Sequence, residues 1–92
     1  MIRSIRHKGL RRLYEDGKAR GVIPEHAAKL RDVLARLDAA SASADMDLPG
    51  FRLHSLKGDF EGFWAVTIRA NWRVIFRFSD GDVHDVDYVD YH

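Results

Sequence analysis

The apolar residues of this chain follow two different periods, and the first of them predicts helices. Between His7 and Asp16 the apolar side chains recur three and four residues apart, and Gly17 supplies a natural helix end. From Pro24 to about Ala39 a second stripe repeats at 3.6-residue spacing, behind a proline suited to the first helical turn. Two helices with such a short connection predict an antiparallel helical hairpin.

After Gly50 the period changes to two, which is typical of β-strands. The segments with this alternation are Phe51 to Leu56, Phe63 to Ile68, Arg73 to Phe78 and Val83 to Val89, and Ile2 to Arg6 is a candidate for a further short strand. The Asp80-Gly81 pair between the last two segments favours a tight hairpin. The stretch from Ala40 to Gly50 is rich in Ala, Ser and Asp and is interpreted as a loop.

These elements predict one α+β domain over residues 1–92, with the N-terminal helical hairpin packed on a mostly antiparallel sheet of about four strands. One helical layer covers only one face of a sheet, so the other face is expected to be open. Arg73 and Arg77 fall opposite the apolar positions of their strand. The open face is therefore expected to be partly basic, which suits RNA.

Composition narrows the class of protein further. The chain has 92 residues, of which 46% are hydrophobic, as expected for a single globular core. It has no cysteine, which excludes disulfides and zinc–thiolate sites. No apolar run approaches the roughly 18 residues of a membrane helix, and no signal peptide is recognisable at the start. We expect a small soluble intracellular domain.

The net charge of +1 conceals an asymmetry along the chain. Seven Lys and Arg residues lie within the first twenty positions, whereas five aspartates lie between positions 80 and 90. A basic face favours a polyanion such as nucleic acid. Ion pairs between the two ends of the chain explain the same pattern without a ligand, and charge alone leaves both interpretations open.

One group of residues carries the chemistry needed to cut RNA without a metal ion. Its members are His54, Lys57, Arg69, Arg73, Asp90, Tyr91 and His92. Cleavage by the RNA's own 2′-hydroxyl needs a base for that hydroxyl, cations for the phosphate and an acid for the leaving oxygen. Histidine, which titrates near pH 6.5, can serve as base or acid. Lysine and arginine meet the electrostatic need, and tyrosine can stack on a base.

Each of these residues also has a purely structural interpretation. His54 lies among leucines and could be a half-buried strand residue, and Lys57 could be a solvated turn residue. Arg69 and Arg73 could pair with the late aspartates. Tyr91 has the opposite strand parity to its two neighbours, so it could simply pack.

A metal site is a further possibility at the end of the chain. His84 shares its strand parity with Asp90 and His92, but the three show no recognised ligand spacing. We expect neither a metal ion nor another cofactor.

The order of motifs along the chain resembles that of a known family. The opening Ile2-Arg3-Ser4-Ile5-Arg6-His7-Lys8-Gly9-Leu10 is followed by Leu53-His54-Ser55-Leu56-Lys57-Gly58-Asp59, Gly62-Phe63-Trp64, Asn71-Trp72-Arg73-Val74 and the terminal Asp90-Tyr91-His92. This set is similar to the HigB toxins, plasmid-maintenance killer proteins of the RelE/ParE superfamily, over nearly the whole chain.

The resemblance implies a RelE-like fold and a ribosome-dependent endoribonuclease that cuts messenger RNA in the decoding site. It implies a HigA-like antitoxin with a helix-turn-helix domain, through which alone the toxin would reach operator DNA. The family's catalytic residues fall on His54, Asp90, Tyr91 and His92. The basic motif positions fall on Lys57 and Arg73, with Arg69 nearby as a third candidate for binding the substrate.

Two other functions remain compatible with such a fold. The first is a gyrase inhibitor, as in the ParE branch of the superfamily, which needs no RNA-cutting residues. The second is a nucleic-acid-binding module that uses only its basic face. The presence of both His54 and Asp90-Tyr91-His92 favours the nuclease.

Overall fold

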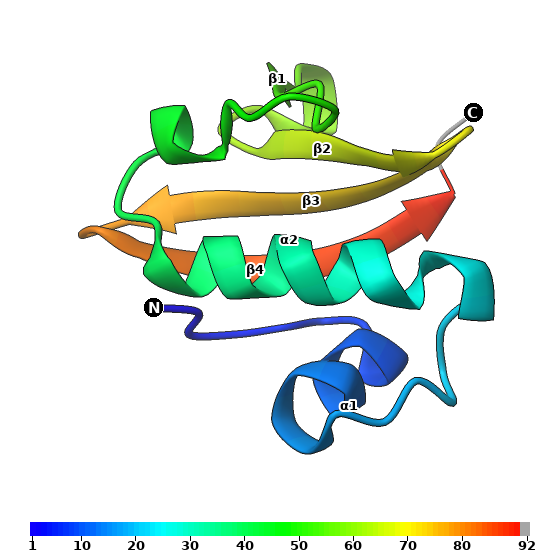
Figure 1. The fold of residues 1–92 in the computed structure, drawn as a ribbon. Helices are drawn as coiled ribbons and strands as arrows, with labels where there is room; N and C mark the ends of the chain where they lie inside the picture. Colours follow the sequence, from blue (N-terminus) through cyan, green and yellow to red (C-terminus); the bar gives the residue numbers. More distant parts are fainter. Residues whose placement is uncertain (91–92) are drawn as a thin grey trace.

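The computed structural model describes residues 1–90, which form a helical layer packed on a four-stranded antiparallel sheet (Figure 1). The two helices are α1 (Lys8–Asp16) and α2 (Ala27–Ala39), and three short 3₁₀ turns are η1 (Pro24–His26), η2 (Ser43–Met46) and η3 (Gly58–Phe60). The strands are β1 (His54–Ser55), β2 (Trp64–Arg69), β3 (Trp72–Ser79) and β4 (Asp82–Asp90). The predicted α+β fold is confirmed.

The strands follow one another in the order β1-β2-β3-β4, and each is antiparallel to its neighbour. The β3–β4 connection consists of Asp80 and Gly81, whose φ angles of 52° and 81° are both in the left-handed region. Two consecutive left-handed residues suit the twist of a two-residue hairpin, and the Asp-Gly pair had predicted this turn.

Two strands differ from their predicted extents. Ile2 and Ile5 form only isolated parallel bridges with Val83 and Val86 of β4, so this segment runs along the sheet edge without becoming a regular strand. The strand predicted from Phe51 shrinks to the two residues of β1. Its early part is interrupted because Arg52 has a φ of 51°, which ends the extended backbone.

Both helices end where the sequence predicts, at Asp16 and Ala39, whereas the predicted second helix starts as the 3₁₀ turn η1 and becomes α-helical only at Ala27. His7 caps α1, because its Nδ1 accepts a hydrogen bond of 3.0 Å from the Leu10 backbone N–H, and Gly17 ends the helix at a φ of 73°. A Cβ on Gly9 would lie 2.2 Å from the carbonyl oxygen of Gly21, so the two glycines allow the chain to return closely past α1.

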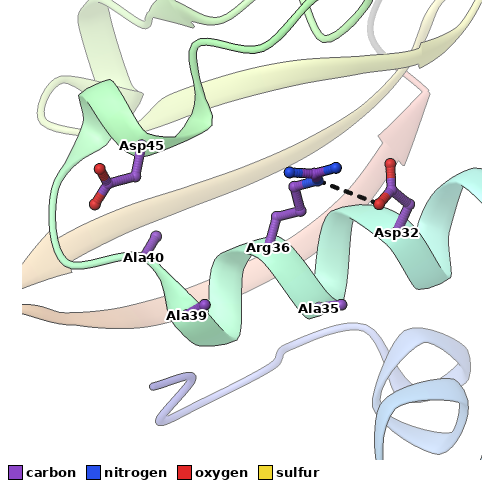
Figure 2. A pocket seen from close by; sticks show the side chains of 6 residues that line it. All are labelled: Asp32, Ala35, Arg36, Ala39, Ala40 and Asp45. Carbon is purple, nitrogen blue, oxygen red and sulfur yellow. Dashed lines mark hydrogen bonds and ion pairs between the residues drawn. The ribbon is translucent and has the colours of Figure 1, made fainter.

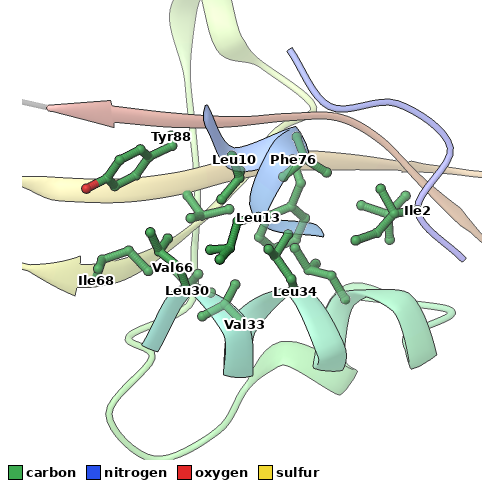
Figure 3. Close-up of a cluster of buried hydrophobic side chains, with 14 of the residues drawn as sticks. Ile2, Leu10, Leu13, Leu30, Val33, Leu34, Val66, Ile68, Phe76 and Tyr88 are labelled. Atoms are coloured by element: carbon green, nitrogen blue, oxygen red, sulfur yellow. The ribbon is translucent and has the colours of Figure 1, made fainter. Parts of the chain in front are cut away.

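The main core lies between the helices and one face of the sheet (Figure 3). The helical layer contributes Leu10, Leu30 and Val33, and the sheet contributes Val66 and Phe76, all of them fully buried. The opposite face carries a smaller cluster made of Leu56, Ala65 and Ile75, with Phe63 and Val89 packed against it. We call this opposite side, which neither α1 nor α2 covers, the open face.

Ion pairs join the basic N-terminal segment to the acidic last strand. The Arg3 Nε lies 2.9 Å from an Asp82 carboxylate oxygen, and Asp85 pairs both with Arg6 at 3.5 Å and with Arg77 at 2.7 Å. These contacts confirm the interpretation of the charge asymmetry as cross-chain pairing for this part of the chain. Hydrogen bonds from the partner arginines hold the pKa values of Asp82 and Asp85 below the usual range.

Candidate active site

One end of the open face is hollowed by a depression of about 510 Å³, which we call the cationic hollow. Its lining residues are Lys29, Gly50, Arg52, His54, Thr67, Ala70 and Arg73. They come from α2, from the loop before β1, from β1 and from the β2–β3 hairpin. No acidic side chain is among the described residues that line it, so the hollow concentrates positive charge and suits an anion.

His54 reaches this hollow from β1, where it pairs with Ala65 of β2. Its side chain is exposed, so the interpretation of His54 as a half-buried strand residue is wrong. The His54 Nδ1 lies 2.9 Å from the Arg52 backbone oxygen. Because a carbonyl oxygen only accepts, this contact requires the hydrogen on Nδ1. In the neutral ring the lone pair is therefore on Nε2, the atom that can take or return a proton.

Two other cations of the hollow, Arg73 and Lys29, donate to neutral backbone oxygens. The Arg73 guanidinium donates to the carbonyl oxygens of Ala70 at 2.6 Å and Trp72 at 3.2 Å, and the Lys29 Nζ donates to the Gly50 carbonyl at 2.9 Å. A carbonyl orients a cation without cancelling its charge. Arg73 uses only one of its nitrogens in these bonds, which leaves donors for a phosphate.

The sequence analysis missed two cations of the hollow, Lys29 and Arg52. Lys29 lies on a helix, where it was indistinguishable from an ordinary solvated lysine. Arg52 has a left-handed backbone conformation that could not be predicted from the neighbouring sequence. Non-glycine residues with this conformation cluster at functional sites. Lys29 and Arg52 come together only because α2 approaches the loop before β1 in the folded protein.

The remaining predicted residues divide into three groups. Asp90 ends β4 opposite Trp72, and the preceding Val89 pairs with Arg73, so the carboxylate is carried on the strand next to the hollow's arginine. Lys57 and Arg69 are exposed, at the start of η3 and at the end of β2, and neither is among the described residues lining the cationic hollow. Tyr91 and His92 lie outside the described residues.

A second depression of about 220 Å³ adjoins this region on the open face, and we call it the apolar hollow. It is lined by Leu56, Phe60, Ile75, Val89 and Asp90. Ile75 follows Arg73 by two residues on β3, and Val89 is the cross-strand partner of Arg73. The two hollows therefore occupy neighbouring positions of the same strands.

A third depression, of about 370 Å³, lies on the helical side between α2 and η2 (Figure 2). Its charged groups already have partners. The Arg36 Nε lies 3.3 Å from Asp32, and the Asp45 carboxylate accepts the backbone N–H groups of Ser41 and Ala42, which lowers its pKa. The rest of its lining is alanine, so this depression offers no reactive group.

Two further findings concern metals and membranes. Within residues 1–90, no group of three His, Cys, Asp or Glu side chains is arranged to hold a metal ion. The expected metal independence stays a prediction, because His92 lies outside that range. No helix in the described part of the chain has the length and apolar character needed to cross a membrane.

The fold and the cationic hollow together define a class of small α+β proteins that present positive charge at one end of an open sheet. The chain belongs to the family described as RelE-like toxin of type II toxin-antitoxin system HigB, which it matches over residues 3–92. Membership in this family confirms the toxin assignment and implies an antitoxin partner.

Two relatives match the chain over its whole length. It is 42% identical over 92 residues to the Endoribonuclease HigB of Proteus vulgaris, with all of both chains covered. It is 32% identical over 97 residues to Toxin HigB-1 of Vibrio cholerae serotype O1, with all of this chain and 98% of the relative covered.

Proposed function

We propose that this toxin is an endoribonuclease that cuts messenger RNA in the decoding site of the ribosome and thereby inhibits translation. The observation that carries the proposal is the cationic hollow, in which His54 presents Nε2 beside Arg73 and Lys29, both of which donate to backbone oxygens. The likeness to a relative named an endoribonuclease, at 42% identity, supports the same reaction class.

The proposed chemistry is acid–base transesterification without a metal ion. A base removes the proton of the 2′-hydroxyl, the resulting oxygen attacks the neighbouring phosphorus, and the 5′-oxygen leaves with a proton from an acid. The His54 Nε2 and the Asp90 carboxylate are the candidates for moving these protons, together with His92. Arg73 stabilises the charge that builds up on the phosphate oxygens, and Tyr91 positions the substrate.

Lys57 and Arg69 would bind the RNA on either side of the cleaved bond. Both are exposed, and each stands near an end of a strand that leads to the hollow. Such positions suit phosphates that approach and leave the site rather than the phosphate that reacts. Their effect would be on affinity more than on the chemical step.

Dependence on the ribosome fits a site whose reactive groups are spread over several elements. RNA that is free in solution rarely holds its 2′-oxygen in line with the leaving oxygen, and the decoding site would impose that geometry. A HigA-like antitoxin with a helix-turn-helix domain would inactivate the toxin and carry it to operator DNA. The site of action would be the bacterial cytoplasm.

Cleavage mapping tests the proposal. Ribosomes programmed with a defined message are mixed with the protein, and the RNA ends are analysed after a single turnover. Cuts that appear only on the ribosome, with a 5′-hydroxyl and a cyclic phosphate as products, support the nuclease. Inhibition of DNA supercoiling without RNA cleavage would support the gyrase inhibitor, and binding without turnover would support a non-catalytic module.

A further inference from the structure

Apart from Asp90, the residues of the apolar hollow have no part in the chemistry described so far, although the hollow lies directly beside it. Its walls are Leu56, Ile75 and Val89, and Phe60 stands at its side with 44% of its surface exposed. Large aromatic side chains on a protein surface with that much exposure are candidates for stacking on unpaired bases.

Phe60 is held in place rather than free to collapse onto the sheet. Its ring meets the ring of Phe63 edge to face, with centroids 5.7 Å apart and planes at 84°. The backbone is fixed by a hydrogen bond of 2.9 Å from the Phe63 N–H to the Phe60 oxygen, and by the tight turn of η3. Gly58 and Gly62, with φ angles of 69° and 93°, allow the chain to enter and leave this turn. The ring is thus presented at little conformational cost.

The spacing of the two hollows suits a nucleotide. Ile75 lies two residues from Arg73 along β3, which is roughly 7 Å, and Val89 lies on the neighbouring strand about 5 Å away. These lengths are comparable with the separation between a phosphate and its own base or the next base. A phosphate bound at Arg73 would therefore place an adjacent base over the apolar hollow.

Charge favours RNA over a protein segment as the occupant. The apolar hollow continues into a surface that carries Lys29, Arg52 and Arg73, and no acidic side chain within residues 1–90 lines the cationic part. An apolar patch joined to uncancelled positive charge complements a base joined to phosphate.

We propose that the apolar hollow binds the unstacked base of one of the two nucleotides flanking the cleaved phosphate, with Phe60 as its stacking partner. This inference rests on the proposed nuclease function and adds a binding site for the substrate base to it. Phe60 is then a positioning residue. It holds the base so that the 2′-oxygen of the RNA is aligned with the phosphate.

The test combines variants of Phe60 with messages that lack a base. Single-turnover cleavage on programmed ribosomes is measured for an intact message and for two messages with an abasic residue on either side of the cut. For the unaltered protein, one abasic message is expected to react roughly 5- to 150-fold more slowly. Phe60→Ala should slow cleavage of the intact message by a similar factor and lose the response to the missing base. Phe60→Trp should restore both.

Tyr14→Ala is the matched control, because Tyr14 is a surface ring of similar exposure, 36%, on α1. It should keep the full response to the missing base. The inference is overturned if the unaltered protein cuts both abasic messages at the normal rate, or if Phe60→Ala keeps the full response. It is also overturned if Phe60→Ala cuts normally but no longer binds the antitoxin, which would make the hollow a protein-docking surface. An unaltered protein that cuts no message at all would overturn the nuclease function, and this inference with it.

Discussion

The two ends of the open face carry the same kinds of basic side chain, but the partners of these side chains differ between the two ends. At the end near the β3–β4 hairpin, Arg77 and Arg6 both pair with the Asp85 carboxylate. At the other end Arg73 and His54 make hydrogen bonds to backbone carbonyl oxygens. Arg73 and Arg77 even project from the same side of β3, four residues apart. A carboxylate partner cancels charge and stabilises the fold, whereas a carbonyl partner orients a side chain and leaves its charge available to a ligand.

The strongest way to break this comparison is to remove His54, a candidate for proton transfer at the end where side chains bond to backbone carbonyls. His54→Ala is expected to lower the single-turnover cleavage rate by roughly 10²–10⁴-fold, while the surrounding cations keep ribosome and RNA binding near normal. His84→Ala, on β4 opposite Arg77, is the matched control and should cut at the normal rate. If His54→Ala cuts as fast as the unaltered protein, proton transfer must rest on other residues.

The two arginines of β3 provide a direct comparison of the two ends. Arg73→Ala is expected to weaken binding to ribosome-bound message by roughly 10–100-fold, because a charge-assisted contact to phosphate is lost. The slope of the logarithm of the binding constant against the logarithm of the salt concentration should become shallower by about 0.7. Arg77→Ala should leave affinity and salt dependence unchanged, since Asp85 already occupies that guanidinium. Binding titrations at several salt concentrations measure the affinity and its salt dependence. Equal losses of affinity for the two variants would refute the distinction between the two ends of the open face.

Arg52 sharpens the comparison, because its left-handed backbone lowers the stability of the fold whereas its charge favours RNA binding. Its left-handed φ of 51° costs roughly 1 kcal/mol, so Arg52→Gly should leave thermal stability unchanged or raise it. The same change removes a cation of the hollow and should weaken RNA binding about tenfold. Asp80→Gly relieves a similar backbone position, with φ 52°, at the ion-paired end and should leave binding intact. Loss of stability in Arg52→Gly would show that its side chain serves the fold.

Much of this architecture was predictable from local patterns. The end of helix α1 at Gly17, the Asp80-Gly81 hairpin and the open sheet face follow from residue periods and turn chemistry. The cationic hollow was predicted only in part. His54 and Arg73 were found through motifs, but their approach to Lys29 and Arg52 depends on how α2 and a loop meet in three dimensions. Periodicity also could not tell which arginine of β3 has an acidic partner, because a register shift between Ile75 and Arg77 sets the pairing with β4.

The smallest expected effect concerns the ion-paired end and its response to acid. Hydrogen bonds from Arg77 lower the pKa of Asp85 in the folded protein, so the stability it contributes is present above its unfolded value of about 3.9. That contribution is lost as the pH falls through the folded pKa. Asp85→Asn should therefore lower the melting temperature by a few degrees at most near pH 7, and the difference should shrink toward pH 3.

Thermal unfolding followed across this pH range measures the effect of Asp85→Asn, with Asp59→Asn in η3 as a control for the loss of one negative charge. Cleavage of ribosome-bound message at neutral pH should be unchanged, because the ion pair stabilises the sheet far from the hollow. A variant that melts with the same pH profile as the unaltered protein would show that the pair contributes nothing measurable. A variant that melts normally but cuts more slowly would show that the ion-paired end also takes part in RNA recognition, and the division of the open face would then fail.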